Sequence, residues 1–187
     1  MSTTTDFEYL RALNESADKQ EILQDLMTAY GRDVWNFAYS LTRKWDQADD
    51  ITQDVFIKVY RNLFSFRQQS SVKTWLLSIT RNTAIDYRRS AFYRKVTLMD
   101  RFTPQGEHPS PEREVLETMA VNEMWSLVMV LPVKYREAIL LYAHHQLSMK
   151  EMAQILGVNE STVKSRLHHA RVQLSKMKER HAHASDR

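Results

Sequence analysis

Residues 148–178 limit the possible folds most, because they carry start and stop signals for two helices in quick succession. Ser148 and Glu151 have the spacing of a capping box, in which each side chain satisfies a backbone N–H of the first turn. Gly157 follows where helices commonly end in a left-handed residue, and Asn159 can cap the next helix. The stretch therefore predicts a helix-turn-helix. Its apolar faces are Met152, Ile155 and Leu156 on the first helix and Val163, Leu167, Ala170 and Leu174 on the second.

The second of these helices has a polar and basic outer face. With Val163 inward, a rotation of about 100° per residue places outward or on the flanks Ser161, Lys164, Ser165, His168, His169 and Arg171. Between Glu160 and Arg180 there are six Lys or Arg and two acids. Such a helix suits the major groove of DNA, where short polar and basic side chains meet base edges and phosphates. The alternative is a solvated amphipathic helix that only packs on its neighbour.

Composition favours an all-α protein in a reducing compartment. The 187 residues include three glycines and four prolines, and they suffice for one large domain or two small ones. The absence of cysteine excludes disulfides and thiolate metal sites and fits a cytoplasmic location. The N-terminus does not resemble a signal peptide, and no apolar run approaches the ~18 residues of a membrane span. Because the net charge is only +3, any nucleic-acid surface must come from local clustering.

The first half of the chain predicts two long helices joined by a turn. The apolar spacing supports helices from about Lys19 to Arg43 and from about Asp46 to Leu63, with the turn at Trp45 to Asp49. Opposite its apolar stripe, the second helix begins with the polar residues Asp49, Asp50, Gln53 and Asp54. Acids stabilise a helix N-terminus, and the same row could also form a docking face for a basic partner.

The next helix is rich in cations and aromatic residues. Ser71 can cap it, and from Lys73 to Lys95 it holds six cations against a single acid. Cations that follow phosphates, together with aromatic rings and amides that hold unstacked bases, are what a single-stranded DNA site needs. The alternative is that the arginines are merely solvated. Trp75 on this helix is assigned to the core.

A stretch without helical period separates the two halves. Residues 95–110 contain two prolines and a glycine, as a linker between domains does. Ser110 and Pro111 then provide a cap and a first helical residue for the next helix. We therefore expect a first domain over residues 1–95, a linker over 96–110 and a second domain over 111–187.

Four passages carry a family resemblance. They are ADDITQDVFIKVYRNLFSF at 48–66, KTWLLSITRNTAIDYRR at 73–89, LPVKYREAILLYAHHQLSMKEMAQILGVNESTVKSRLHHAR at 131–171, and the proline-containing linker. Together they cover nearly the whole chain and resemble bacterial RNA polymerase sigma factors of the extracytoplasmic-function (ECF) type. The resemblance implies two small helical domains, called region 2 and region 4, joined by a flexible linker. It implies no third domain between them and no N-terminal inhibitory extension.

The resemblance also implies a role for each polar surface. The resemblance implies that a coiled coil of the polymerase β′ clamp is bound by Asp49, Asp50, Gln53 and Asp54. Opening of the minus-ten promoter element, with a flipped base read by Asn82, falls to Lys58, Phe66, Lys73, Arg81, Asn82, Arg88 and Arg89. The minus-thirty-five element is read by Ser161, Thr162, Lys164, Ser165, His168, His169 and Arg171. His168 and His169 depart from the family pattern, in which an aromatic residue and an arginine are expected.

The implied activity is promoter-specific initiation of transcription. The implied partners are core RNA polymerase, through its β′ clamp coiled coil and its β flap, promoter DNA, and an anti-sigma factor, which is often membrane-anchored. The chain would contribute recognition and no covalent chemistry. We expect no cofactor and no small-molecule substrate.

Two other function classes are compatible with parts of the sequence. A helix-turn-helix transcription regulator with an N-terminal sensor or dimerisation domain would not need the cations and aromatics of residues 73–95. An enzyme could use the paired histidines, which are His144 with His145, His168 with His169, and His181 with His183. However, no acid or cysteine stands at ligand spacing with any of them, and there is no glycine-rich phosphate loop. We therefore expect neither a metal site nor a catalytic residue.

Overall fold

The computed structural model describes residues 19–66, 70–97 and 123–185. Within these ranges every regular element is a helix, which confirms the all-α prediction. The elements are α1 Lys19–Thr42, α2 Trp45–Asn62, the short 3-10 helix η2 Leu63–Ser65, α3 Val72–Thr97, α5 Glu123–Val130, α6 Val133–Ala143, α7 Met149–Leu156 and α8 Glu160–Ser185. Of the predicted linker over 96–110, Val96 and Thr97 still belong to α3, and its remainder and the helix start at Pro111 lie outside the described residues.

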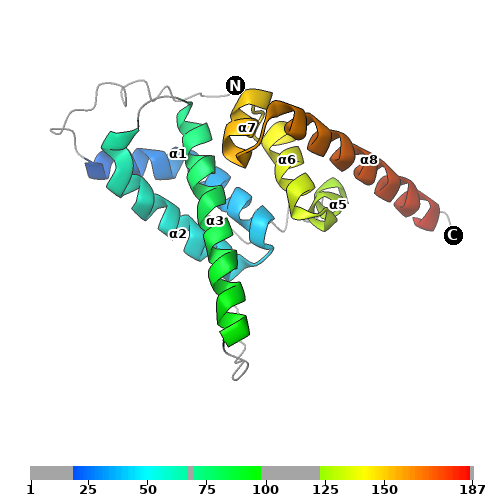
Figure 1. The fold of residues 1–187 in the computed structure, drawn as a ribbon, viewed down its shortest axis with the longest axis horizontal. Helices are drawn as coiled ribbons and strands as arrows, with labels where there is room; N and C mark the ends of the chain where they lie inside the picture. The colour runs from blue at the N-terminus through cyan, green and yellow to red at the C-terminus, as the bar shows by residue number, and fades with distance from the viewer. Residues whose placement is uncertain (1–18, 67–69, 98–122, 186–187) are drawn as a thin grey trace.

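The first helical domain consists of α1, α2 and α3, which pack against one another (Figure 1). Its core includes Leu26, Val34, Ile51, Val55 and Leu76, none of which is more than 1 % exposed. These residues belong to the apolar stripes of the sequence, so their burial provides the main stabilising free energy of this domain.

The turn predicted at Trp45 to Asp49 is wrong, because α2 already begins at Trp45. The chain reverses at Arg43 instead, which adopts a left-handed conformation with φ of 59°. The Trp45 ring packs on Trp35 and Tyr39, with ring centroids 4.8 and 5.2 Å apart. This aromatic contact holds Trp45 in the first turn of α2, and spacing along the sequence gives no sign of it.

The second helical domain contains the helix-turn-helix as predicted. The Ser148 Oγ accepts from the Glu151 backbone N–H at 3.3 Å, and Glu151 Oε2 accepts from the Ser148 backbone N–H at 3.0 Å, which completes the capping box of α7. Gly157 ends α7 with φ of 64°, and the Asn159 side chain accepts from the Thr162 N–H at 2.8 Å. On α8 Val163, Leu167 and Ala170 are buried, so the opposite face of α8 is turned to solvent.

The two domains lie against each other, with α3 beside α7 and α1 beside α6 (Figure 1). Their buried apolar side chains join in one continuous cluster. At the α3–α7 contact, Glu151 Oε1 accepts hydrogen bonds from Thr74 at 2.9 Å and from Ser71 at 3.3 Å. Burial alone would raise the pKa of Glu151, but these bonds and those from Ser148 lower it. Glu151 therefore stays ionised while it joins the two domains.

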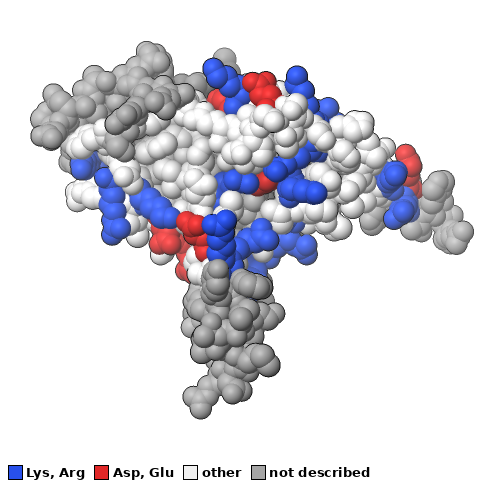
Figure 2. All heavy atoms as spheres, viewed as in Figure 1, with Lys and Arg blue, Asp and Glu red and all other residues white. Residues whose placement is uncertain are grey.

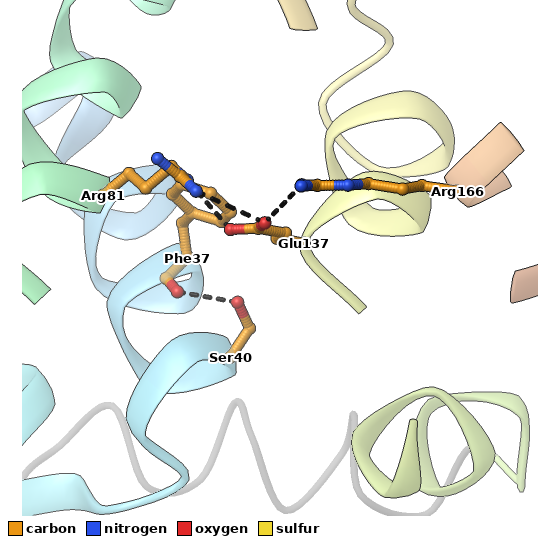
Figure 3. A network of polar contacts seen from close by, with 5 residues as sticks. All are labelled: Phe37, Ser40, Arg81, Glu137 and Arg166. Carbon is orange, nitrogen blue, oxygen red and sulfur yellow. Dashed lines mark hydrogen bonds and ion pairs between the residues drawn. The ribbon is translucent and has the colours of Figure 1, made fainter. Parts of the chain in front are cut away.

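A shared carboxylate forms the second polar contact between the domains. Arg81 of α3 donates from Nε to Glu137 Oε2 at 2.9 Å, and Arg166 of α8 donates from Nη1 to Glu137 Oε1 at 3.1 Å. Figure 3 shows the two arginines approaching Glu137 from opposite sides. The Glu137 side chain is only 6 % exposed, so the two arginines take the place of water around its carboxylate.

Replacement of Glu137 by glutamine tests this contact. We expect Glu137→Gln to weaken the association of the domains by about 1–3 kcal/mol, because two partly buried guanidinium groups lose their ionised partner. Small-angle X-ray scattering should then show a larger radius of gyration, while circular dichroism shows unchanged helix content. The control is Glu160→Gln, at an exposed acid on α8, which should change neither measurement. Equal radii for all three proteins would show that Glu137 does not hold the domains together.

Candidate nucleic-acid interface

The four polar residues at the start of α2 fall into two pairs. Asp49 accepts from the Trp35 indole N–H at 2.6 Å, and Asp50 accepts from the Tyr87 hydroxyl of α3. Both acids therefore help to pack the helices of the first domain. Gln53 and Asp54 are exposed on the next turn, where a partner can reach them.

An apolar groove lies beside this exposed pair, between α1 and α2. It has a volume of about 890 Å³, and its lining includes Leu23, Met27, Phe56, Ile57 and, toward α2's polar edge, Gln53. Met27 and Ile57 are each 48 % exposed, which is unusual for large apolar side chains. Sequence reasoning missed the groove, although both residues stand outside the buried apolar stripes of their helices.

The middle of α3 presents the predicted base-reading residue to solvent. Asn82 is exposed, and its neighbour Thr83 accepts a hydrogen bond from Lys58 Nζ of α2 at 2.9 Å. Trp75 lies two helical turns before Asn82, hence on the same face of α3. The Phe66 ring packs on Trp75 with centroids 4.9 Å apart. Lys58, through Thr83, and Phe66, through Trp75, thus both contact the helix that carries Asn82.

The four predicted cations of α3 have different surroundings. Arg88 and Arg89 are exposed. Lys73, by contrast, pairs with Asp33 of α1 at 3.1 Å, and Arg81 is held by Glu137 of the second domain. Figure 2 shows lysines and arginines in several small groups with acids between them, rather than as one continuous basic field. In this arrangement of the domains only part of the basic side of α3 is open to a ligand.

The outer face of α8 carries the predicted groove-reading residues. Thr162 is half-buried. The other six are exposed, namely Ser161, Lys164, Ser165, His168, His169 and Arg171. Two of them are braced by aromatic rings, since His169 stacks on Tyr135 at 5.8 Å and Arg171 lies over Tyr142 at 5.0 Å. His169 Nδ1 also lies 2.8 Å from the Ser165 carbonyl oxygen. The residues near the start of α8 therefore form an exposed polar row on a rigid helix.

One cluster of possible ligands escaped the sequence analysis. Asp33 of α1 meets His144 and His145 after α6, and one ligand atom of each residue lies within 4.8 Å of the others. Reasoning from spacing found no acid for this histidine pair, because the acid comes from the other domain. Folding alone brings the three together.

Comparisons with known proteins agree with these features. The family model for sigma-70 region 2 matches residues 26–91, and the model for sigma-70 region 4 matches residues 121–174. Among the described residues, no helix combines the length and apolarity that crossing a membrane requires.

Individual relatives match along most of their length. The RNA polymerase sigma factor YlaC of Bacillus subtilis is 31 % identical, over 84 % of this chain and 92 % of YlaC. The ECF RNA polymerase sigma factor SigM of the same organism is also 31 % identical, over 81 % of this chain and 92 % of SigM. The sigma factor RpoE of Bartonella quintana, solved in complex with the anti-sigma factor NepR, shares the fold with a TM-score of 0.68 and 27 % identity, over 86 % of this chain and 98 % of RpoE. On these grounds the chain belongs to the ECF family of RNA polymerase sigma factors, which bind core polymerase and direct promoter-specific initiation of transcription.

Proposed function

We propose that this sigma factor uses three surfaces in turn: α2 for the polymerase, α3 for the opened minus-ten element and α8 for the minus-thirty-five element. The observation that best supports this division is that each helix exposes the side chains its role requires. Gln53 and Asp54, Asn82, and Lys164 with its neighbours are all at the surface. The region 2 domain comprises residues 1–95 and the region 4 domain residues 111–187.

Docking on the polymerase combines polar and apolar contacts. Gln53 and Asp54 offer hydrogen bonds and a negative charge to a basic side chain of the β′ clamp coiled coil. The groove beside them, lined by Leu23, Met27 and Ile57, can bury apolar side chains of the same partner helix. Polar contacts then set the register, whereas burial provides most of the affinity.

Recognition of the minus-ten element relies on the exposed amide of Asn82. An amide can donate to and accept from the edge of a base that has left the stack. The hydrogen bond between Lys58 and Thr83 braces the adjoining surface, and the paired rings of Phe66 and Trp75 offer an apolar face for bases. Arg88 and Arg89 continue along α3 as phosphate contacts.

Recognition of the minus-thirty-five element relies on the polar row near the start of α8. An α-helix fits the major groove, and the residues in its first turns reach the base edges. Ser161, Lys164, Ser165 and His168 occupy those turns, while Arg171 lies one turn further along, where phosphates are expected.

The packed arrangement of the domains differs from the promoter-bound one. The two elements are named for positions −10 and −35, so their centres are about 25 base pairs apart. At 3.4 Å per pair this is roughly 85 Å of duplex. Domains that share hydrogen bonds at Glu151 and Glu137 cannot read both elements at once. The 25 residues between Thr97 and Glu123 have an extended length of about 85 Å, so the chain is long enough for separation.

Control by a partner follows from the same arrangement. RpoE of Bartonella quintana was solved in complex with an anti-sigma factor, and we expect an anti-sigma protein to restrain this chain as well. The sigma factor itself contributes recognition and no covalent chemistry. It acts in the cytoplasm, where polymerase and promoter DNA are.

The docking role is tested by the double substitution Gln53→Ala/Asp54→Ala. We expect the affinity for core RNA polymerase to fall at least tenfold, about 1.4 kcal/mol, because the polar contacts at the edge of the groove are lost. Fluorescence anisotropy of labelled sigma factor with core enzyme measures this. Gln24→Ala/Asp25→Ala, a matched pair on α1, serves as control and should bind as wild type does. Wild-type affinity of the α2 variant would refute the docking assignment.

The base-reading role is tested by Asn82→Ala. We expect slower formation of the open complex with nearly unchanged binding in the closed complex, because the amide acts only on the unpaired base. Permanganate footprinting follows strand opening, and gel shifts at low temperature follow the closed complex. Arg88→Ala should instead weaken both steps and reduce the salt dependence. If Asn82→Ala impairs both steps equally, Asn82 is structural.

The duplex-reading role is tested by Lys164→Ala. Run-off transcription over a randomised promoter library should show a loss of about 1–3 kcal/mol in discrimination at one position of the minus-thirty-five element. Lys176→Ala, further along α8, should lower the yield on all sequences alike, as loss of a phosphate contact does. A uniform loss for Lys164→Ala as well would mean that Lys164 contacts only the backbone.

A further inference from the structure

Three side chains with metal-binding chemistry meet where the two domains touch. Asp33 belongs to α1, whereas His144 and His145 form the turn that follows α6. One ligand atom of each lies within 4.8 Å of the other two. His145 Nδ1 is 3.8 Å from Asp33 Oδ1, which is too far for a hydrogen bond and leaves room for an ion between them.

The His145 ring nitrogen is an unsatisfied polar atom inside the protein. His145 is only 3 % exposed, and its Nδ1 has no hydrogen-bond partner. Buried polar groups in native proteins almost always have a partner, so an orphaned ring nitrogen directed at a carboxylate calls for an explanation. A cation coordinated by both groups would satisfy the two at once.

The backbone and the surrounding rings hold the histidines in place. The N–H groups of His144 and His145 both donate to the Leu140 carbonyl at 3.0 Å, which closes the end of α6. The His145 ring lies edge-on to Phe37, and the His144 ring lies edge-on to Trp125. The ligands are therefore positioned by packing, as metal sites require.

The surroundings of Asp33 leave one oxygen for an ion. Its Oδ2 is paired with Lys73 Nζ at 3.1 Å, whereas Oδ1 is the oxygen that faces His145. Lys73 thus orients the carboxylate, as the partners of metal-binding carboxylates do. Its positive charge also opposes a bound cation, so it should weaken the site without abolishing it.

The donor set identifies the class of metal. Two imidazoles and one carboxylate suit first-row divalent ions such as Zn²⁺, Co²⁺ and Ni²⁺, whereas Mg²⁺ and Ca²⁺ prefer oxygen ligands. Ligand atoms around a tetrahedral ion are about 3.3 Å apart, so small side-chain rotations must bring the three groups closer.

We propose that Asp33, His144 and His145 bind one Zn²⁺, Co²⁺ or Ni²⁺ ion, with solvent in the remaining position. Because the ligands come from both domains, the ion binds the packed arrangement and stabilises it by mass action. Arg81 then stays paired with Glu137. Only the effect on transcription rests on the proposed function, since metal binding itself is a property of the free chain.

Metal titration of the metal-free, full-length protein tests the site directly. Calorimetry with Zn²⁺ and visible absorption with Co²⁺ should each show one ion per chain. Asp33→Asn and His144→Ala should each weaken binding at least tenfold. The control His181→Ala/His183→Ala removes the histidines near the C-terminus and should leave this binding unchanged. Absence of saturable binding by wild type, or wild-type affinity of Asp33→Asn, would overturn the proposal.

A variant that is expected to bind metal more tightly separates loss of the site from loss of the fold. Lys73→Met removes the cation beside Asp33 and should strengthen binding several-fold, an effect that a misfolded protein cannot produce. Without polymerase or DNA present, Zn²⁺ should also reduce the radius of gyration of Glu137→Gln toward that of wild type. No gain with Lys73→Met and no compaction of Glu137→Gln would show that the ion does not join the domains. Such negative results would refute the metal site but not the proposed promoter recognition, because neither measurement involves DNA.

Discussion

The position of the two domains depends on one buried carboxylate, that of Glu137. A carboxylate with so little exposure needs cations beside it, because the low-polarity interior disfavours an isolated charge. Its partners are unequal. Arg166 belongs to the same domain and can stay with Glu137 when the domains part, whereas Arg81 leaves with α3. When Arg81 leaves, Glu137 keeps one of its two cationic partners, Arg166. The contact is therefore suited to reversible opening.

This contact gives α8 and α3, the two helices proposed to bind DNA, different accessibility. The polar row of α8 is exposed in the packed arrangement, and duplex DNA can approach it directly. On α3 the amide of Asn82 is exposed, but Arg81 and Lys73 are engaged by Glu137 and Asp33. If α3 binds an unpaired strand as proposed, that strand competes with protein carboxylates for these two cations. The polar row of α8 is thus available first, and the cations of α3 become available only when their ion pairs open.

Local signals made the helix-turn-helix predictable. The capping box at Ser148, the left-handed Gly157 and the cap at Asn159 act within a few residues, so the sequence displays each of them completely. The exposed positions of Asn82 and Lys164 follow from helical periodicity and the apolar stripes opposite them. The family resemblance, rather than periodicity, supplied their roles.

Contacts between distant segments were not predictable in this way. Periodicity places charged residues at the surface, yet Arg136 and Glu137 are buried because the other domain covers α6. Burial and nearby Arg43 and Arg88 lower the pKa of Arg136 to about 10. The start of α2 depends on the packing of the Trp45 ring against α1. In each case the cause is a contact with another helix, to which the spacing rules within one helix do not apply.

The two oxygens of Glu151 have separate tasks, and this has a consequence for motion. Oε2 caps α7 through Ser148, whereas Oε1 accepts from Thr74 of α3 and from Ser71 just before it. Water can replace the α3 hydroxyls at Oε1 while the bond at Oε2 persists. The DNA reader can therefore detach as a preformed rigid body, at the microsecond-to-millisecond pace of hinge movements, with no unwinding step to delay it.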